Sequence, residues 1–109
     1  MDIKVEWNYD EFATFLMIYA SHVDLEFSDS EKERIKAQIS DATFEKMYKA
    51  FRDKTDFESL QTILAYKGLY YPTEARKAEL LDKVKMIFFA DGEYSQMEME
   101  LYNFFKKLM

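Results

Sequence analysis

The segment FATFLMIYA, residues 12–20, is the longest apolar run in the chain. Apolar residues in and just beyond it recur three and four positions apart, at Phe12, Phe15, Leu16, Tyr19 and Val23. This is the spacing of one face of an α-helix. The pattern predicts a helix from Asp10 to about Val23 that packs through that face.

The same run bears on membrane insertion and secretion. It is much shorter than the roughly 20 apolar residues that span a membrane, so we expect no membrane insertion. Asp10 and Glu11 precede it, at the place where a secretory signal would carry positive charge. We therefore expect a cytoplasmic protein.

The composition favours one helical domain. The chain has 109 residues, enough for one domain and too few for two of ordinary size. Hydrophobic residues make up 49% of it, whereas there are only 2 Gly and 1 Pro. Ample apolar material with few turn-forming residues is typical of an all-α fold.

Missing residue types exclude several kinds of chemistry. The sequence contains no Cys and a single His, His22. A disulfide, a thiolate nucleophile and a Cys-bound zinc are therefore excluded, and a His-rich metal site is not expected. No cofactor motif or nucleophile–base arrangement is evident either, so we predict that the protein is not an enzyme.

The net charge of −6 is unevenly distributed. Residues 1–31 contain eight acidic residues and one Lys, whereas residues 32–90 contain nine acidic and twelve basic residues. Proteins that bind nucleic acid draw most of their affinity from clustered Lys and Arg, so we expect no nucleic-acid binding. The acidic N-terminal third is a candidate surface for a basic protein partner.

Ser or Thr followed three residues later by Glu marks a helix start called a capping box. This motif occurs at Ser28–Glu31, Thr55–Glu58 and Ser95–Glu98. Further helices are predicted at about 42–51 and 73–90. Gly68 and Gly92 are expected to end helices, with LYYPTE (69–74) as a connection and a short extended piece at 3–7.

The residues expected to face inward from these helices are Ile35, Ile39, Phe44, Met47, Tyr48, Phe51, Leu60, Ile63, Leu64, Leu80, Leu81, Val84, Ile87, Phe88, Met97, Leu101, Phe104, Phe105 and Leu108. Together the patterns predict an all-α fold: a compact single-domain bundle of five to six helices over residues 1–109.

One acidic pattern occurs twice. From Asp24 the chain reads D-L-E-F-S-D-S-E, and from Asp91 it reads D-G-E-Y-S-Q-M-E. Each copy lies between two predicted helices, which gives two helix–acidic loop–helix repeat units at roughly 10–39 and 73–108.

The second copy carries a family resemblance. FADGEYSQMEMELYNFF (89–105) resembles the hallmark loop of the TerB-like family, which reads A-D-G-x-x-S/T-x-x-E between two helices of an all-α bundle. Here its positions are Ala90, Asp91, Gly92, Ser95 and Glu98. The first copy matches less well, because Leu25 stands where the family has Gly.

The resemblance implies a small helical module without enzymatic activity, linked to stress responses and tolerance of metals or tellurium oxyanions. It also implies multiprotein assemblies, and binding of divalent cations by the acidic loop in some members. Because the chain has no Cys, it has no thiol of its own with which to reduce tellurite.

Helix capping explains part of the repeated loop without any ligand. Gly92 suits the end of a helix, Ser95 caps the next, and Glu98 returns a bond to the Ser95 amide. Glu93 precedes a helix N-terminus, where negative charge is favoured. Asp91 is not explained, because an acid near a helix C-terminus opposes the helix dipole.

A cation would relieve that repulsion. Hard cations such as Ca²⁺ take oxygen ligands, often at alternate positions of one loop. The candidate metal ligands are Asp91, Glu93, Ser95 and Glu98, with a weaker second set at Asp24, Glu26, Ser28 and Glu31. Ca²⁺ is the expected ion, with Mg²⁺ or Mn²⁺ as alternatives, and no other cofactor is expected.

Three other features have two interpretations each. His22 is either a ligand or partner for Asp24 or a helix-end residue favoured there when protonated. Trp7 either folds back on the bundle or forms an exposed patch. The seven Met and the Phe-rich faces are either core or the lining of an apolar-ligand pocket.

The sequence thus predicts a non-enzymatic TerB-like module, a stress-response scaffold or binding domain whose acidic loops hold a divalent cation. A metal-independent protein-interaction domain that uses the acidic N-terminal third is the alternative, and an apolar-ligand-binding bundle is a third hypothesis. A protein partner is expected in either of the first two cases. The oligomeric state and the partner's identity are left open.

Overall fold

Helices account for the regular structure of the protein. The structure, a computed structural model, describes residues 6–23, 33, 35–37, 39–88 and 96–109. The helices in these ranges are α1 (Tyr9–Val23), α3 (Asp41–Arg52), α4 (Asp56–Ala65), α5 (Lys67–Tyr70), α6 (Glu74–Phe88) and α7 (Gln96–Leu108). No strand occurs there, so the prediction of an all-α fold is confirmed. The radius of gyration is 13.0 Å, as expected for a compact chain of this length.

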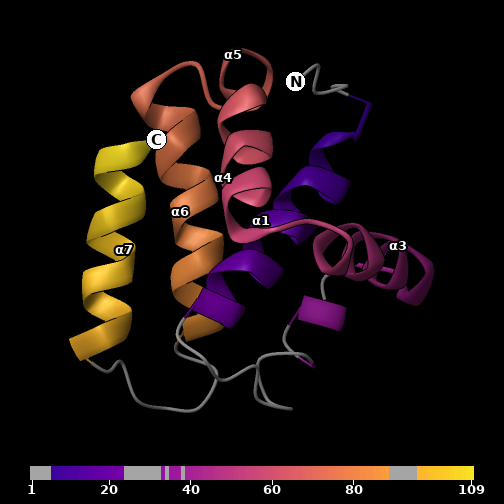
Figure 1. Ribbon diagram of the computed structural model, residues 1–109. Helices are drawn as coiled ribbons and strands as arrows, with labels where there is room; N and C mark the ends of the chain where they lie inside the picture. Colours follow the sequence, from indigo (N-terminus) through magenta and orange to yellow (C-terminus); the bar gives the residue numbers. More distant parts are fainter. Residues whose placement is uncertain (1–5, 24–32, 34, 38, 89–95) are drawn as a thin grey trace.

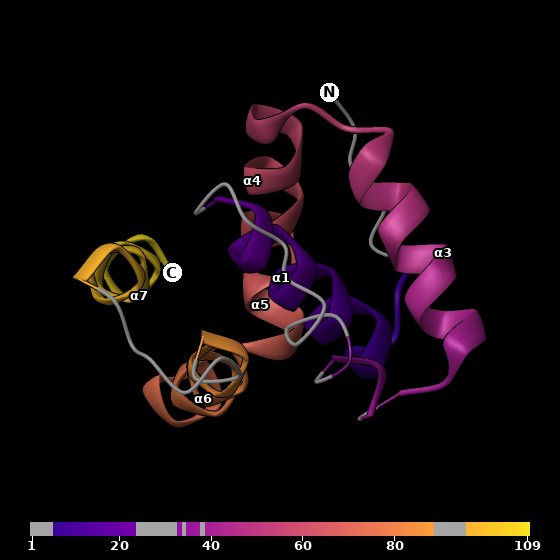
Figure 2. The same ribbon diagram turned by 90° about the horizontal axis from the view of Figure 1, so that it is seen from below.

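Helix α1 lies in the middle of the molecule, with α3 on one side and α4, α6 and α7 on the other (Figures 1 and 2). Every residue from Phe12 to Ser21 is buried, and Tyr19 is the most exposed of them at 6%. The predicted inward face is therefore confirmed at Phe12, Phe15, Leu16 and Tyr19, whereas the side chain of Val23 is not described. The prediction is incomplete, because Met17 and Ile18 on the opposite side are covered as well. The helix is a core element and not an amphipathic one.

Burying α1 on all sides also buries two hydroxyl groups. The Thr14 Oγ1 donates a hydrogen bond to the Asp10 carbonyl at 2.7 Å, and the Ser21 Oγ donates to the Met17 carbonyl at 2.9 Å. Each hydroxyl is thus satisfied within its own helix, which removes the free-energy cost of an unpaired buried polar group.

Two clusters of side chains form the core, one on each side of α1. The smaller cluster joins Met17 and Ile18 to Ile35 and to two residues of α3, Phe44 and Met47. The larger contains the opposite side of α1 together with Ile63, Tyr66, Tyr71, Leu80, Leu81, Val84, Phe105 and Met109. Helix α1 is the element that both clusters share.

The chain before α1 folds back on the larger cluster. The Trp7 amide donates to the Tyr66 hydroxyl at 3.1 Å, and the Tyr70 hydroxyl donates to the Trp7 carbonyl. The Trp7 ring stacks on Tyr66 with centroids 5.5 Å apart and also lies 4.8 Å from Phe15. Trp7 is therefore partly buried against the bundle, and Glu6 and Trp7 are not in a strand; residues 3–5 of the expected extended piece are not described.

Helix α1 begins one residue earlier than the sequence pattern indicated. Asn8 caps it: the Glu11 amide donates to Asn8 Oδ1 at 2.8 Å, and the Asn8 amide donates to Glu11 Oε1 at 3.0 Å. The other Glu11 oxygen, Oε2, accepts a hydrogen bond from Lys46 Nζ of α3 at 2.6 Å. Glu11 therefore stabilises the helix start and joins α1 to α3.

The predicted Thr55–Glu58 capping box is present at the start of α4. The Ser28 and Ser95 boxes fall outside the described residues, but Glu33, Ile35 and Lys36 are helical and Ile35 is buried. Gly68 does not end a helix, since it lies inside the single-turn helix α5 and the connection before α6 shortens to residues 71–73.

Two residues predicted to be core are exposed. Leu64 is 37% exposed because the buried side of α4 is formed by Ser59, Thr62 and Ile63. Phe104 is 48% exposed because its neighbour Phe105 is the α7 residue that enters the core. Adjacent apolar residues on a helix point about 100° apart, so spacing alone did not decide between them.

The burial of both sides of α1 can be tested at Ile18, which a one-faced helix would leave exposed. Replacing Ile18 with Ala should lower the free energy of unfolding by about 2–5 kcal/mol, because it removes buried methyl groups and leaves a cavity. Urea denaturation is the measurement. Leu69→Ala is the control: Leu69 is 55% exposed, and its loss should cost less than about 1 kcal/mol. Equal, small losses would contradict the central position of α1.

The Glu11 contacts predict a specific acid sensitivity. The Lys46 hydrogen bond, helped by the Asn8 amide, lowers the pKa of Glu11 below its usual value. A carboxylate with a lowered pKa stabilises the fold above the unfolded-state pKa of about 4.3, and this contribution is lost as the pH falls through the folded value.

Urea midpoints measured from about pH 7 to about pH 3 should therefore fall less steeply for Glu11→Gln than for the unchanged protein. Glu45→Gln, at an exposed position on α3, is the matched control and should follow the unchanged protein. Identical profiles for Glu11→Gln and the unchanged protein would show that the Lys46 contact does not stabilise the ionised form.

Candidate functional site

The acidic residues predicted from the sequence fall almost entirely outside the described ranges. Asp24, Glu26, Ser28 and Glu31 lie in the segment after α1, and Asp91, Glu93 and Ser95 lie in the segment before α7. Glu98 belongs to the first turn of α7, although its side chain is not among those described. The structure therefore neither assembles nor separates the predicted ligands.

The helices that flank these segments are described, and their directions show from which end of the molecule each acidic segment starts. Helices α1 and α6 pack against each other, and both run toward the lower end of the molecule in Figure 1. Helix α1 ends there at Val23 and α6 at Phe88, and α7 begins at the same end. Both acidic segments consequently start from one end of the bundle.

Helix dipoles give this end a definite electrostatic character. A helix C-terminus carries a partial negative charge and an N-terminus a partial positive one. Among the described helix ends, the C-termini of α1 and α6 and the N-terminus of α7 lie toward this end of the molecule. The α7 N-terminus favours a nearby carboxylate such as Glu98, whereas the two C-termini favour a cation.

His22, the neighbour of the first acidic segment, is engaged in packing. Its Nδ1 lies 2.9 Å from the Ile18 carbonyl, and its ring lies against Phe51 with centroids 4.6 Å apart. The ring also contacts Tyr48 of α3 at 5.7 Å. These contacts give His22 a role at the junction of α1 and α3 that needs no metal ion.

The described side chains outside the two acidic segments also bear on where a cation could bind. In the described ranges, no group of three or more His, Asp and Glu side chains is placed to hold a metal ion. A cation site built from three or more such side chains would therefore need residues outside the described ranges.

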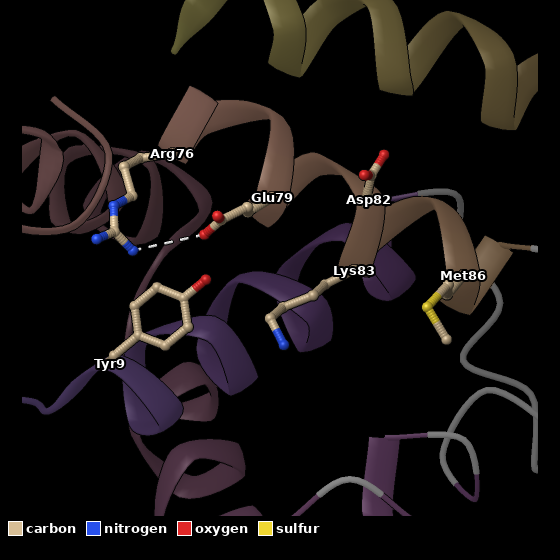
Figure 3. Close-up of a pocket in the computed structure, with 6 residues that line it drawn as sticks. All are labelled: Tyr9, Arg76, Glu79, Asp82, Lys83 and Met86. Atoms are coloured by element: carbon tan, nitrogen blue, oxygen red, sulfur yellow. Dashed lines mark ion pairs between the residues drawn. The ribbon is translucent and has the colours of Figure 1, made fainter. Parts of the chain in front are cut away.

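A surface groove lies between the start of α1 and one side of α6 (Figure 3). It has a volume of about 450 Å³ and is lined by Tyr9, Arg76, Glu79, Asp82, Lys83 and Met86. Arg76 Nη1 lies 3.6 Å from Glu79 Oε2, and Lys83 Nζ lies 5.9 Å from the centre of the Tyr9 ring. Two basic and two acidic side chains line the groove, so it selects neither anions nor cations by charge.

The groove is lined mainly by polar and charged side chains. Burial, followed by the charge of Glu79, raises the pKa of Tyr9, which keeps its hydroxyl protonated at neutral pH. The six lining residues include no Ser, Thr, Cys or His that a base could activate. The groove offers hydrogen bonds and ionic contacts to a polar segment of a partner.

Helix α4 has an unusual distribution of side chains. Its buried residues are Ser59, Thr62 and Ile63, two of which carry hydroxyls, whereas Phe57 is 68% exposed. The outward side consists of Phe57, Leu60, Gln61, Leu64 and Ala65, and we call it the α4 outer face. It carries no charged residue, although 33% of the chain is charged.

The buried side of α4 contains a polar mismatch. The Thr62 Oγ1 donates to the Glu58 carbonyl at 2.7 Å, but the buried Ser59 Oγ has no hydrogen-bond partner in the part of the chain that the structure describes. The middle of α4 therefore contributes little apolar area to the core. The large side chains that enter the core from this part of the chain are Ile63 and, just beyond the helix, Tyr66.

Comparison with models of protein families, with curated proteins and with solved structures finds no match to this chain. Among the described helices, none is both long and apolar enough to cross a membrane.

Sequence reasoning missed the groove and the α4 outer face. The groove combines one residue before the apolar run with a polar stripe of α6, and no spacing rule joins the two. The α4 outer face did leave a signal: Phe57, Leu60 and Leu64 recur at helical spacing while Ser59 and Thr62 occupy the opposite side. The sequence analysis predicts that Leu64 faces inward, and this prediction is wrong because the side chain is exposed.

The mismatch at Ser59 gives a stability prediction. Replacing Ser59 with Ala should raise the free energy of unfolding by about 1 kcal/mol, because it removes an unsatisfied buried hydroxyl and improves helix propensity. Thermal and urea denaturation measure the change.

Ser21→Ala is the matched control, since Ser21 is equally buried in a helix but its hydroxyl is hydrogen-bonded. This variant should be neutral or less stable than the unchanged protein. A loss of stability for Ser59→Ala would mean that the Ser59 hydroxyl has a bonding partner after all.

Proposed function

We propose that this protein is a non-enzymatic, TerB-like binding module that acts as a cytoplasmic stress-response scaffold and holds a divalent cation at its acidic segments. One observation carries the proposal: α1 and α6 cross at an angle, but both end toward the lower end of the bundle in Figure 1. The two copies of the acidic pattern are therefore attached to one end of the molecule rather than to opposite ends.

The attachment points support cation binding electrostatically. Asp24 directly follows the last residue of α1, and Asp91 follows the end of α6 by three residues. A carboxylate next to a helix C-terminus is repelled by the partial negative charge of that helix end, and a bound cation offsets this repulsion. Capping alone does not explain why acids recur at both positions.

The number of oxygen ligands also favours cooperation between the two segments. Ca²⁺ takes six to eight oxygens, more than Asp91, Glu93, Ser95 and Glu98 supply without water or a second segment. The second set, Asp24, Glu26, Ser28 and Glu31, starts from the same end of the bundle and supplies further carboxylates. Ca²⁺ fits this adaptable oxygen set best, and Mg²⁺ or Mn²⁺ are the alternatives.

The competing proposal is a protein-interaction domain that needs no metal and uses its acidic N-terminal third. Glu6 and Asp10 are exposed and available to a basic partner. Glu11 is not, because it is bonded to Asn8 and Lys46. This proposal predicts partner capture that weakens with salt and is indifferent to chelators.

A thermal melt separates the two. The melting temperature should rise by more than about 5 °C when Ca²⁺ replaces EDTA at 100 times the dissociation constant, because such binding adds about 2.7 kcal/mol to stability. Mg²⁺ and Mn²⁺ should be measured alongside. Glu98→Gln, or Asp91→Asn with Glu93→Gln, should abolish the shift.

Glu100→Gln is the matched control, as an exposed glutamate two positions further along α7. It should keep the full response to Ca²⁺. The cation proposal fails if no ion shifts the melting temperature, or if the shift survives in the Asp91→Asn/Glu93→Gln variant; the interaction domain would then be the better explanation.

A further inference from the structure

One side of helix α4 is apolar and exposed to solvent. Phe57 is 68% exposed and Leu64 is 37% exposed, and they lie seven residues apart on the same side of the helix. Gln61 lies between them, so that three successive turns of the α4 outer face are uncharged. An exposed apolar stripe of this kind is typical of a surface that another helix covers.

Gly68 leaves open space next to the α4 outer face. It lies in α5, one turn beyond Leu64, and its φ is outside the left-handed region that favours glycine. A Cβ added there would meet no described atom within 4 Å, so packing within this chain does not require glycine either. The space beside Gly68 is therefore open to a side chain of a second molecule.

The charges at the two ends of this stripe identify the partner. Asp56 is exposed at the start of α4, and Lys67 is exposed just after its end. At 100° per residue the two lie along the same edge of the α4 outer face. A second copy placed antiparallel therefore brings Asp56 of each chain next to Lys67 of the other, which forms two equivalent ion pairs.

The same register fits the apolar residues. With Asp56 opposite Lys67, the axis of symmetry passes close to Gln61, and Phe57 of one chain lies at the level of Ala65 and Gly68 of the other. Two small residues there leave room for a phenylalanine ring. In a parallel arrangement the same edge of the two helices would lie on opposite sides of the interface, so Asp56 and Lys67 would not meet across it.

We propose that the α4 outer face is a homodimer interface in which two copies of α4 pack antiparallel, with Phe57 of each chain seated against Ala65 and Gly68 of the other. Such an interface is isologous, so one stripe serves both chains. It extends beyond the proposed cation-binding function and does not depend on it, because it uses none of the acidic segments.

The interface is small, and the dimer should be weak. A ten-residue helix is about 15 Å long, and the area that it covers falls below that of a standard stable interface. A dissociation constant of about 10–100 µM is therefore expected, so that the protein is a monomer when dilute and a dimer at high local concentration.

Sedimentation velocity in EDTA, from about 5 µM to about 500 µM protein, measures this equilibrium without any contribution from a cation. The unchanged protein should shift from monomer to dimer over this range. Phe57→Ala should weaken the dimer at least tenfold, because it removes from each chain the aromatic side chain that is seated against the other. Phe104→Ala, at an exposed phenylalanine on α7, is the matched control and should dimerise normally.

Charge reversal tests the register. Asp56→Lys and Lys67→Asp should each abolish dimerisation when alone, because each homodimer then pairs like charges twice. An equimolar mixture of the two variants should form a heterodimer, since both of its ion pairs are restored. Circular dichroism melts confirm that each variant is folded, so that loss of association is not mistaken for unfolding.

Three results would overturn the proposal: a monomer at every concentration, a dimer that Phe57→Ala leaves intact, or a mixture of the charge variants that does not associate. A monomer at every concentration would mean that a second copy does not cover the α4 outer face. A dimer that survives Phe57→Ala would place the contact between copies elsewhere on the surface. The third would exclude the antiparallel register.

Discussion

The complete burial of helix α1 is the constraint on which the rest of the structure depends. Phe12 to Ser21 are covered on every side, so neighbours are required all around the helix. Helix α3 with Ile35 covers one side, and α4, α6 and α7 cover the other. The Thr14 and Ser21 hydroxyls bond back to their own helix, which allows burial without polar partners elsewhere. Trp7 and Glu11 then fix the start of α1, through Tyr66 on one side and Lys46 on the other.

The surfaces available for function follow from this arrangement. Helix α6 packs against α1 and both helices end toward the lower end of Figure 1, so the two acidic segments start from one end of the bundle. Helix α4 reaches the core mainly through Ile63 and the neighbouring Tyr66, and its middle contributes small residues. The larger apolar side chains of α4, Phe57 and Leu64, are consequently left outside. One core helix thereby sets both the end of the molecule proposed to bind a cation and the stripe proposed to bind a second copy.

The sequence predicted the helices well and their orientations less well. Capping motifs and apolar spacing located α1, α3, α4 and α6 to within about one or two residues at the described ends. The apolar pattern places the start of α1 at Asp10 and does not indicate the Asn8–Glu11 cap. Periodicity failed where a helix is apolar on more than one side: it left Met17 and Ile18 outside the core and placed Leu64 and Phe104 inside it. Which side of such a helix is covered depends on its neighbours, and no local pattern encodes them. The acidic segments, the strongest functional signal in the sequence, stay a prediction.

Paramagnetic broadening by Mn²⁺ tests most directly whether the end of the bundle formed by α1 and α6 is a cation site. Substoichiometric Mn²⁺ added to the labelled protein should broaden the amide signals of Val23 and Phe88 together, because both helices end beside the bound ion. The amides of Asn8 and Glu74, at the opposite ends of α1 and of α6, should keep their intensity. Unchanged signals at Val23 and Phe88, or equal broadening at both ends of the molecule, would contradict the account.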